Sequence, residues 1–102
     1  TLYGVTKLFD EDLGRYCALT TPVSVIHLRV SNCTPRLLGP SGTVLGQLDS
    51  YQDLQQLTVK IIEAPADLKF DIFWATSDNA KRFRDNRYAK DVLGYAPQDG
   101  VL

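Results

Sequence analysis

The run VSVIHLRV at residues 23–30 limits the possible folds more than any other segment. Its side chains are mostly apolar or β-branched and show no polar face, which is the pattern of a strand covered on both sides. Such strands belong to parallel sheets, in which helices connect consecutive strands and cover the faces. FDIFWAT at residues 70–76 predicts a second strand.

Three helices are predicted around these strands. The first runs from Tyr3 to about Leu19 and ends before Pro22, because the residue before a proline is pushed out of the helical region. Its apolar residues recur with a spacing near 3.6, typical of an amphipathic helix: Val5, Leu8, Phe9, Leu13, Tyr16 and Cys17.

The second helix is predicted to begin after Ser50 and to close before Pro65. Ser50 is a good N-cap and Asp53 occupies the third helical position. Its apolar face consists of Leu54, Leu57, Ile61 and Ile62. The third helix covers about Asn86 to Leu93 and stops at Gly94.

Turn-forming residues fill segment 31–42, which predicts a loop, and a short extended piece is expected at Val44–Leu48. The resulting order is helix, strand, helix, strand, helix. This order is typical of an α/β protein with a parallel sheet.

Length and charge narrow the functional classes. With 102 residues the chain is long enough for one domain, and 11 basic against 12 acidic residues leave a formal charge of −1. Because the sequence contains no stripe of basic residues that could follow a phosphate backbone, we do not expect nucleic acid or a membrane surface as a partner. No apolar run approaches the roughly 20 residues of a membrane span.

Cysteine and histidine are too few for a structural metal site. Cys17, Cys33 and His27 are the only residues of these two types, whereas a zinc site takes about four ligands. We therefore expect no metal and read both cysteines as reduced thiols of a cytoplasmic protein. His27 lies within an apolar strand and is expected to be a packed side chain.

The segment YGVTK at residues 3–7 places a phenol and an ammonium group four residues apart. Residues at this spacing lie on one helical face, so Tyr3 and Lys7 can reach the same bound molecule. A nearby ammonium lowers the pKa of a phenol, which makes it a better proton acceptor. The same spacing also fits a surface aromatic beside a solvated lysine.

The sequence around Tyr3 and Lys7 resembles that of a known protein family. YGVTKLFDEDLGRYCA followed by VIHLRVSNCTPR resembles the extended short-chain dehydrogenase/reductase superfamily. The tail WATSDNAKRFRDNRYAKDVLGYAPQD is similar to the NAD-dependent epimerase/dehydratase family, nearest its uronate dehydrogenase branch, as are SNCTP at 31–35 and the pair Ser50 and Asp53. The resemblance covers practically the whole chain.

The resemblance implies a fold and a set of site residues. The fold would be the C-terminal part of a doubly wound Rossmann-like sheet, with residues 1–102 forming a single partial domain on the catalytic-helix and substrate side. Tyr3 would be the catalytic base, and Lys7 would assist it and bind the cofactor's ribose. Ser31 and Cys33 would lie beside the nicotinamide of NAD or NADP, and Asn32 would face the substrate.

The loop holding these last residues also has a purely structural interpretation, as a strand-to-loop turn in which Asn32 tolerates a left-handed backbone. Arg36 is a further candidate contact for a substrate carboxylate. Thr43 stands where uronate dehydrogenases carry an arginine for the sugar carboxylate.

The Gly-rich turn that holds the cofactor's pyrophosphate in this family is absent from the chain. GPSGTVLG at residues 39–46 follows a loop and has the wrong spacing. Enzymatic activity of this chain alone is therefore not expected.

Two functional hypotheses follow. In the first, the chain is part of an NAD(P)-dependent sugar or uronate oxidoreductase or epimerase, active when a complementary N-terminal polypeptide supplies the nucleotide-binding half. In the second, it is a truncated, non-catalytic module that folds by self-association into a homo-oligomer through the helix at 3–19, the dimer helix of the family.

Overall fold

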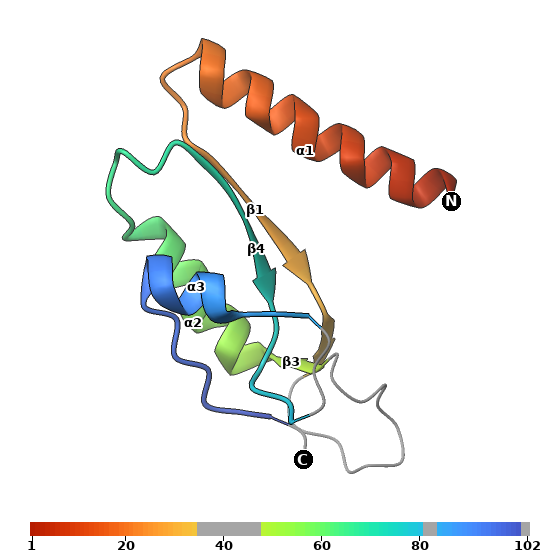
Figure 1. The fold of residues 1–102 in the computed structure, drawn as a ribbon, viewed down its shortest axis with the longest axis vertical. Helices are drawn as coiled ribbons and strands as arrows, with labels where there is room; N and C mark the ends of the chain where they lie inside the picture. The colour runs from red at the N-terminus through yellow and green to blue at the C-terminus, as the bar shows by residue number, and fades with distance from the viewer. Residues whose placement is uncertain (35–47, 81–83, 101–102) are drawn as a thin grey trace. The chain divides into compact units, whose positions relative to one another are not determined.

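The computed structural model describes residues 1–34, 48–80 and 84–100. Figure 1 shows an alternation of helices and strands that confirms the predicted α/β class. The elements in chain order are α1 (Leu2–Thr20), β1 (Val25–Val30), β2 (Asn32–Thr34), β3 (Leu48–Ser50), α2 (Tyr51–Ile62), β4 (Phe70–Ala75) and α3 (Arg87–Leu93).

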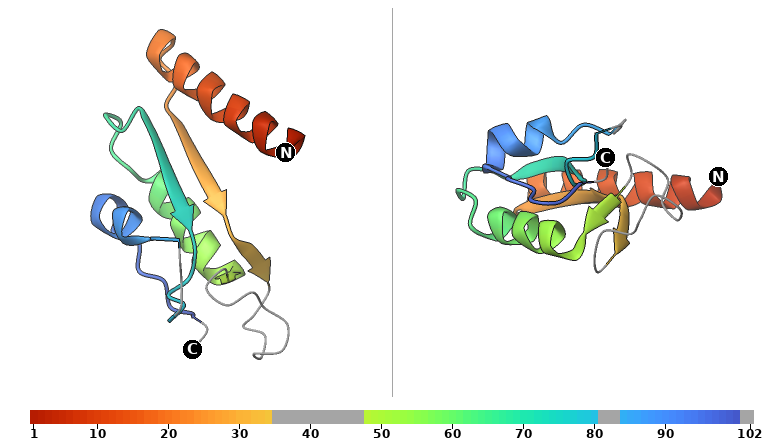
Figure 2. Two further views of the ribbon diagram at one scale, coloured as in Figure 1. Left: turned by 45° about the vertical axis from the view of Figure 1, so that its right-hand side comes forward. Right: turned by 90° about the horizontal axis from the view of Figure 1, so that it is seen from below.

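The two strands predicted from their apolar runs pair with each other. β1 and β4 form one sheet, and their arrows run in the same direction in both Figure 1 and Figure 2. Backbone hydrogen bonds flank the pair, from Val25 N to Lys69 O at 2.8 Å and from Ser31 N to Ala75 O at 3.2 Å. The parallel sheet predicted from the sequence is therefore confirmed.

The prediction of a loop over 31–42 is wrong at its start. Residues 32–34 form β2, which pairs in parallel with β3, so that Cys33 lies opposite Asp49. The turn-forming residues of this segment indicated no strand because its hydrogen-bonding partner is distant in sequence, and pairing can override weak strand propensity. The remainder of that loop, and the extended piece expected at 44–47, lie outside the described residues.

The chain divides into two compact units. The first comprises residues 1–27 and 65–72, and the second comprises 28–64 and 73–102.

Helix α1 dominates the first unit. Thr1 caps it by accepting a hydrogen bond from Gly4 N at 2.9 Å, and Thr21 is the C-cap. The predicted helix is confirmed, but its small residues Gly14 and Ala18 are the buried ones. The large apolar side chains lie on the opposite side, exposed to solvent: Leu2, Val5, Phe9, Leu13 and Tyr16.

Gly14 allows a close approach between α1 and β1. A Cβ atom at this position would lie 2.2 Å from His27 Nε2 and 2.9 Å from Val25 Cγ1. Gly14→Ala should therefore lower the free energy of unfolding by about 1–3 kcal/mol through overpacking, measured by urea denaturation. Gly4→Ala is the matched control, since its Cβ would meet only Thr1 Oγ1 at 3.3 Å. Equal stability of the two variants would contradict this packing.

In the second unit, α2 begins as the sequence predicts. Ser50 Oγ accepts a hydrogen bond from Asp53 N at 3.1 Å, which satisfies one of the free amides of the first turn. Leu57 is fully buried, whereas Ile62, predicted on the same face, is 75% exposed.

Helix α3 ends at Gly94, whose φ of 70° is left-handed. A residue without Cβ adopts this conformation at little cost, which explains the predicted stop. Phe73 of β4 stacks on Tyr88 of α3 with ring centroids 5.3 Å apart. Among the residues described, no helix is both long and apolar enough to cross a membrane.

Candidate functional site

Tyr3 and Lys7 lie together on the first turns of α1. Lys7 Nζ is 5.2 Å from the centroid of the Tyr3 ring, a cation–π distance. The Tyr3 side chain is 71% exposed, so its phenol is open to a molecule or a polypeptide bound from outside. The structure thus brings the predicted catalytic pair into contact, with the ammonium over the ring.

Ser31, Asn32 and Cys33 follow β1 in the second unit. Ser31 is buried, and its Oγ has no hydrogen-bond partner. Asn32 pairs through its backbone with Leu48. The Cys33 side chain is largely exposed. Its partial burial, followed by the charge of Asp49, raises the pKa of this thiol. Cys17, like Cys33, is a free thiol.

Two further residues named from the sequence, Arg36 and Thr43, lie outside the described residues. The glycine-containing segment 39–46 lies there as well.

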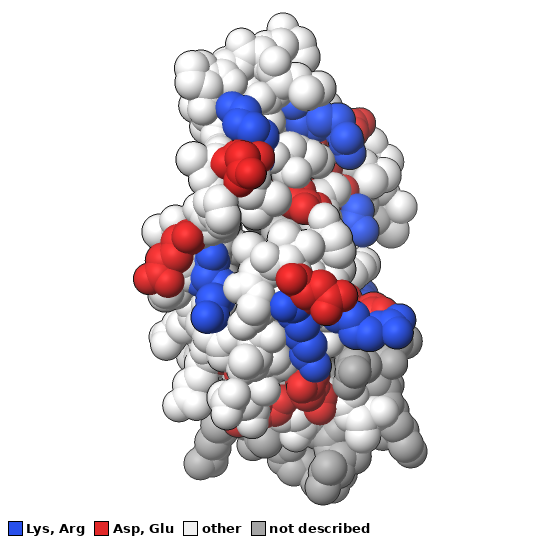
Figure 3. Space-filling model, turned by 60° about the vertical axis from the view of Figure 1, so that its left-hand side comes forward, with Lys and Arg blue, Asp and Glu red and all other residues white. Residues whose placement is uncertain are grey.

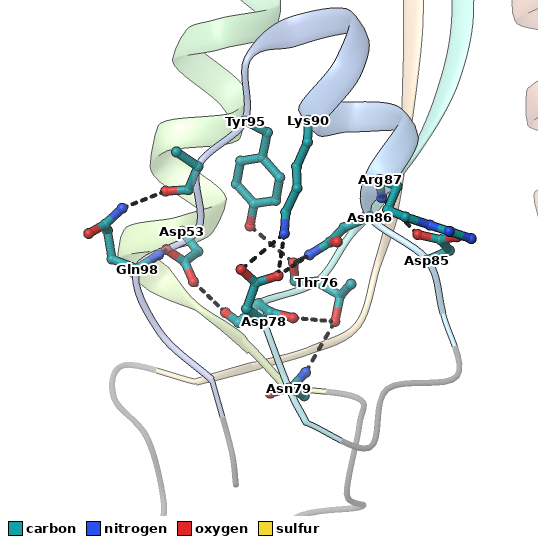
Figure 4. A network of polar contacts seen from close by, with 12 residues as sticks. Asp53, Thr76, Asp78, Asn79, Asp85, Asn86, Arg87, Lys90, Tyr95 and Gln98 are labelled. Carbon is teal, nitrogen blue, oxygen red and sulfur yellow. Dashed lines mark hydrogen bonds and ion pairs between the residues drawn. The ribbon is translucent and has the colours of Figure 1, made fainter.

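A buried polar network that sequence reasoning did not predict surrounds Asp53. This residue is 1% exposed, and its carboxylate accepts hydrogen bonds from Ser77 Oγ at 2.6 Å, Gln98 N at 2.7 Å and Asp99 N at 3.2 Å. Figure 4 shows Asp53 on α2 beside the C-terminal segment that carries Gln98. Asp53 therefore joins the start of α2 to the segments after β4 and α3.

The segment after β4 is held by a second group of contacts, also visible in Figure 4. Asn86 donates to Thr76 O at 3.1 Å and to Asp78 Oδ1 at 3.0 Å, and Lys90 Nζ forms an ion pair with Asp78 at 2.8 Å. Tyr95 donates its hydroxyl to Thr76 O at 3.2 Å. In the sequence, the S-x-x-D spacing pointed to Asp53. No sequence pattern pointed to Thr76, Asp78, Asn86, Lys90 or Tyr95, because these residues meet only in the folded chain.

Asp49 differs from Asp53 in its hydrogen bonding. It is fully buried, and neither of its carboxyl oxygens has a hydrogen-bond partner among the residues that the structure describes. Burial, followed by the charge of Asp53, raises the pKa of Asp49 to about 7.

His27 and Trp74 were interpreted from the sequence as packed residues, and both side chains make ring contacts in the structure. His27 meets Phe70 edge-on at 5.6 Å between ring centroids. Trp74 is partly exposed and has the guanidinium groups of Arg29 and Arg84 at 5.2 and 5.0 Å from its ring. On the face drawn in Figure 3, basic and acidic side chains are interspersed.

No three His, Cys, Asp or Glu side chains within the described part of the chain are grouped so that they could hold a metal ion. The alternation of helices with parallel strands is that of part of a Rossmann-like fold.

Comparison with known proteins agrees with this class. The chain is 38% identical over 100 residues to an NAD-dependent glucose-6-phosphate dehydrogenase of Haloferax volcanii, covering 96% of the chain and 37% of that protein. It is 30% identical to a uronate dehydrogenase of Agrobacterium fabrum, over 98% of the chain and 36% of the relative.

A solved structure is similar over the same extent. A mutant uronate dehydrogenase from Agrobacterium tumefaciens, complexed with NAD, matches 97% of this chain and 36% of its own with a TM-score of 0.83 and 29% identity. No family model matches the chain. The chain is similar over nearly its whole length to these uronate and glucose-6-phosphate dehydrogenases and spans a little over a third of their length.

Proposed function

We propose that this chain is the catalytic-helix and substrate-side portion of an NAD-dependent dehydrogenase of a sugar or sugar acid. The observation that carries the proposal is the contact between Tyr3 and Lys7 on α1, in a chain homologous to dehydrogenases over nearly its whole length. The complementary nucleotide-binding half comes from another polypeptide or from further chain.

Tyr3 takes the proton of the substrate hydroxyl. Its exposed phenol is free to meet a sugar held against the start of α1. Lys7 assists, because a cation near a phenol favours its ionised form. Lys7 also has three donors, so it can bind a ribose hydroxyl while it faces the Tyr3 ring.

The cofactor fits this chain only in part. NAD supplies the acceptor for the hydride that leaves the sugar carbon. Ser31 and Cys33 fit its nicotinamide end, since Ser31 Oγ is buried without a partner, a condition that favours an additional hydrogen-bonding group. The sequence has no Gly-rich turn between a first strand and helix for the pyrophosphate. Tight binding of NAD is therefore expected only with the complementary half.

The test combines binding and complementation. NADH is titrated into the purified chain while energy transfer from Trp74 to the nicotinamide is followed. The chain is then mixed with the N-terminal portion of the Haloferax or Agrobacterium relative, and NADH formation is measured with glucose 6-phosphate and uronates. We expect no saturable binding to the isolated chain and measurable turnover in the mixture.

In the complemented enzyme, Tyr3→Phe should lower kcat by about 10²–10⁴-fold, because it removes a general base. Tyr16→Phe is the matched control on the same helix, with a similarly exposed ring at 65%. Unchanged turnover of Tyr3→Phe would remove Tyr3 from the mechanism, and saturable NADH binding by the isolated chain would overturn the need for a second half.

A second candidate function is a non-catalytic module that self-associates through α1. The specific observation in its favour is the exposed apolar side of this helix, where Phe9 is 64% and Tyr16 is 65% exposed. Apolar patches of this kind mark contact surfaces.

A further inference from the structure

The buried carboxyl group of Asp49 has no established part in the proposed reaction, and its surroundings point to an unusual protonation state. It lies in the middle of β3, opposite Cys33 of β2 in the register. Its side chain is fully buried, and within residues 1–34, 48–80 and 84–100 neither oxygen has a hydrogen-bond partner. An ionised carboxylate in such a place would be strongly destabilising.

Asp53 provides the contrast within the same unit. It is equally buried, yet its carboxylate receives three hydrogen bonds, from Ser77 Oγ, Gln98 N and Asp99 N. Donors of this kind stabilise the charged form of a carboxylate. Of the two neighbouring acids, Asp53 is therefore the group suited to carry the negative charge, and Asp49 is the group suited to keep a proton.

Among the residues that the structure describes, no cation is placed beside Asp49. Asp53 on α2 acts on Asp49 with a like charge, and Cys33 on β2 is a neutral thiol whose pKa is raised. Burial raises the pKa of Tyr95, and the negative charges of Asp49, Asp53, Asp78 and Asp99 raise it further. Within the described part of the chain, the ammonium group of Lys90 at this cluster is paired with Asp78.

We propose that Asp49 is a proton switch of the β2–β3 ladder: its neutral carboxyl group permits the ladder to form, and loss of the proton favours opening of the ladder. Because Cys33 lies directly opposite Asp49, opening would release the segment that also carries Ser31 and Asn32. The switch would act on this segment whether or not the chain is catalytic.

The direction of the pH dependence follows from linkage. The Asp49 pKa is about 7 in the folded chain and about 4 in an open, solvated state. Between these values the folded form binds more protons, so its stability falls as the pH rises and levels off above about pH 7. With these two pKa values, the opening equilibrium should rise roughly tenfold between about pH 6 and about pH 8.

Hydrogen exchange of the backbone amides tests this on the intact chain. After correction for the intrinsic rates, protection of β2 and β3 should fall roughly tenfold over that pH range. The amide of Val25, bonded to Lys69 O, serves as the internal reference, because it lies outside the segment that opening would release. Asp49→Asn should remove the pH dependence, while Asp67→Asn, an exposed acid, should leave it unchanged. Equal pH dependence in Asp49→Asn and in the unaltered chain would overturn the proposal.

A direct readout covers the case in which Asp49→Asn does not fold. In chain labelled with carbon-13 at the aspartate carboxyl groups, the Asp49 signal should titrate near pH 7. If every aspartate signal in the folded chain titrates below about pH 5, within the ordinary range for this residue, Asp49 is ionised at neutral pH and the switch does not exist.

Discussion

Asp53→Ala should lower the free energy of unfolding by about 3–5 kcal/mol, a large part of the 5–15 kcal/mol typical of a whole domain. The Asp53 carboxylate is 1% exposed and accepts three hydrogen bonds. Its removal leaves Ser77 Oγ and the amides of Gln98 and Asp99 without this acceptor. A buried donor left unpaired, as Ser77 Oγ would be, costs about 1–3 kcal/mol, and the partly buried amides of Gln98 and Asp99 each add less. Urea denaturation at neutral pH measures the change.

Two further variants separate the charge of Asp53 from its shape. Asp53→Asn keeps the size of the side chain but replaces one acceptor oxygen with a donor, so its loss should be substantial and smaller than that of the alanine variant. Asp91→Ala removes an exposed carboxylate of α3 in the same unit and should change stability by less than about 0.5 kcal/mol. If Asp53→Ala costs no more than Asp91→Ala, the network does not hold the C-terminal segment.

The second large effect is expected on the exposed side of α1. Val5→Glu together with Phe9→Glu should weaken self-association of the chain at least about hundredfold, measured by sedimentation equilibrium. Both side chains are more than half exposed, Val5 at 60% and Phe9 at 64%. Burying such a side chain against a second copy contributes about 1.5–3 kcal/mol, and each 1.4 kcal/mol corresponds to a factor of ten in the dissociation constant.

Asp10→Ala is the control for this experiment. Asp10 is exposed on the same helix and lies about 100° around it from Phe9 and further from Val5, off the apolar side. Its replacement should change the dissociation constant only slightly. A chain that sediments as a monomer up to high concentration would reject self-association through α1 altogether.

Local signals in the sequence were sufficient for the main elements. The 3.6-residue spacing predicted α1, the apolar runs predicted β1 and β4, Ser50 and Asp53 marked the start of α2, and Gly94 marked the end of α3. Each of these signals acts within a few residues, through capping, periodicity or backbone freedom. The Tyr3–Lys7 contact was likewise predictable, because both residues belong to one helix.

Tertiary structure decided the features that depend on distant partners. β2 became a strand because Leu48–Ser50 pairs with it. Helix α1 buries Gly14 and Ala18, and at Gly14 a Cβ atom would clash with Val25 and His27. A hydrophobic pattern identifies a helix, but it does not say whether the sheet of the same chain or another molecule covers its apolar side.

The opposite environments of Asp49 and Asp53 also depend on folding. The two acids are four residues apart in the sequence, and nothing in their types distinguishes them. Only the folded chain brings Ser77, Gln98 and Asp99 to one carboxylate and none of them to the other. Sequence determined the helices and strands of this protein and its similarity to known dehydrogenases, because both follow from the order of the residues. Folding decided which polar groups are paired, because hydrogen bonds form between segments far apart in the chain.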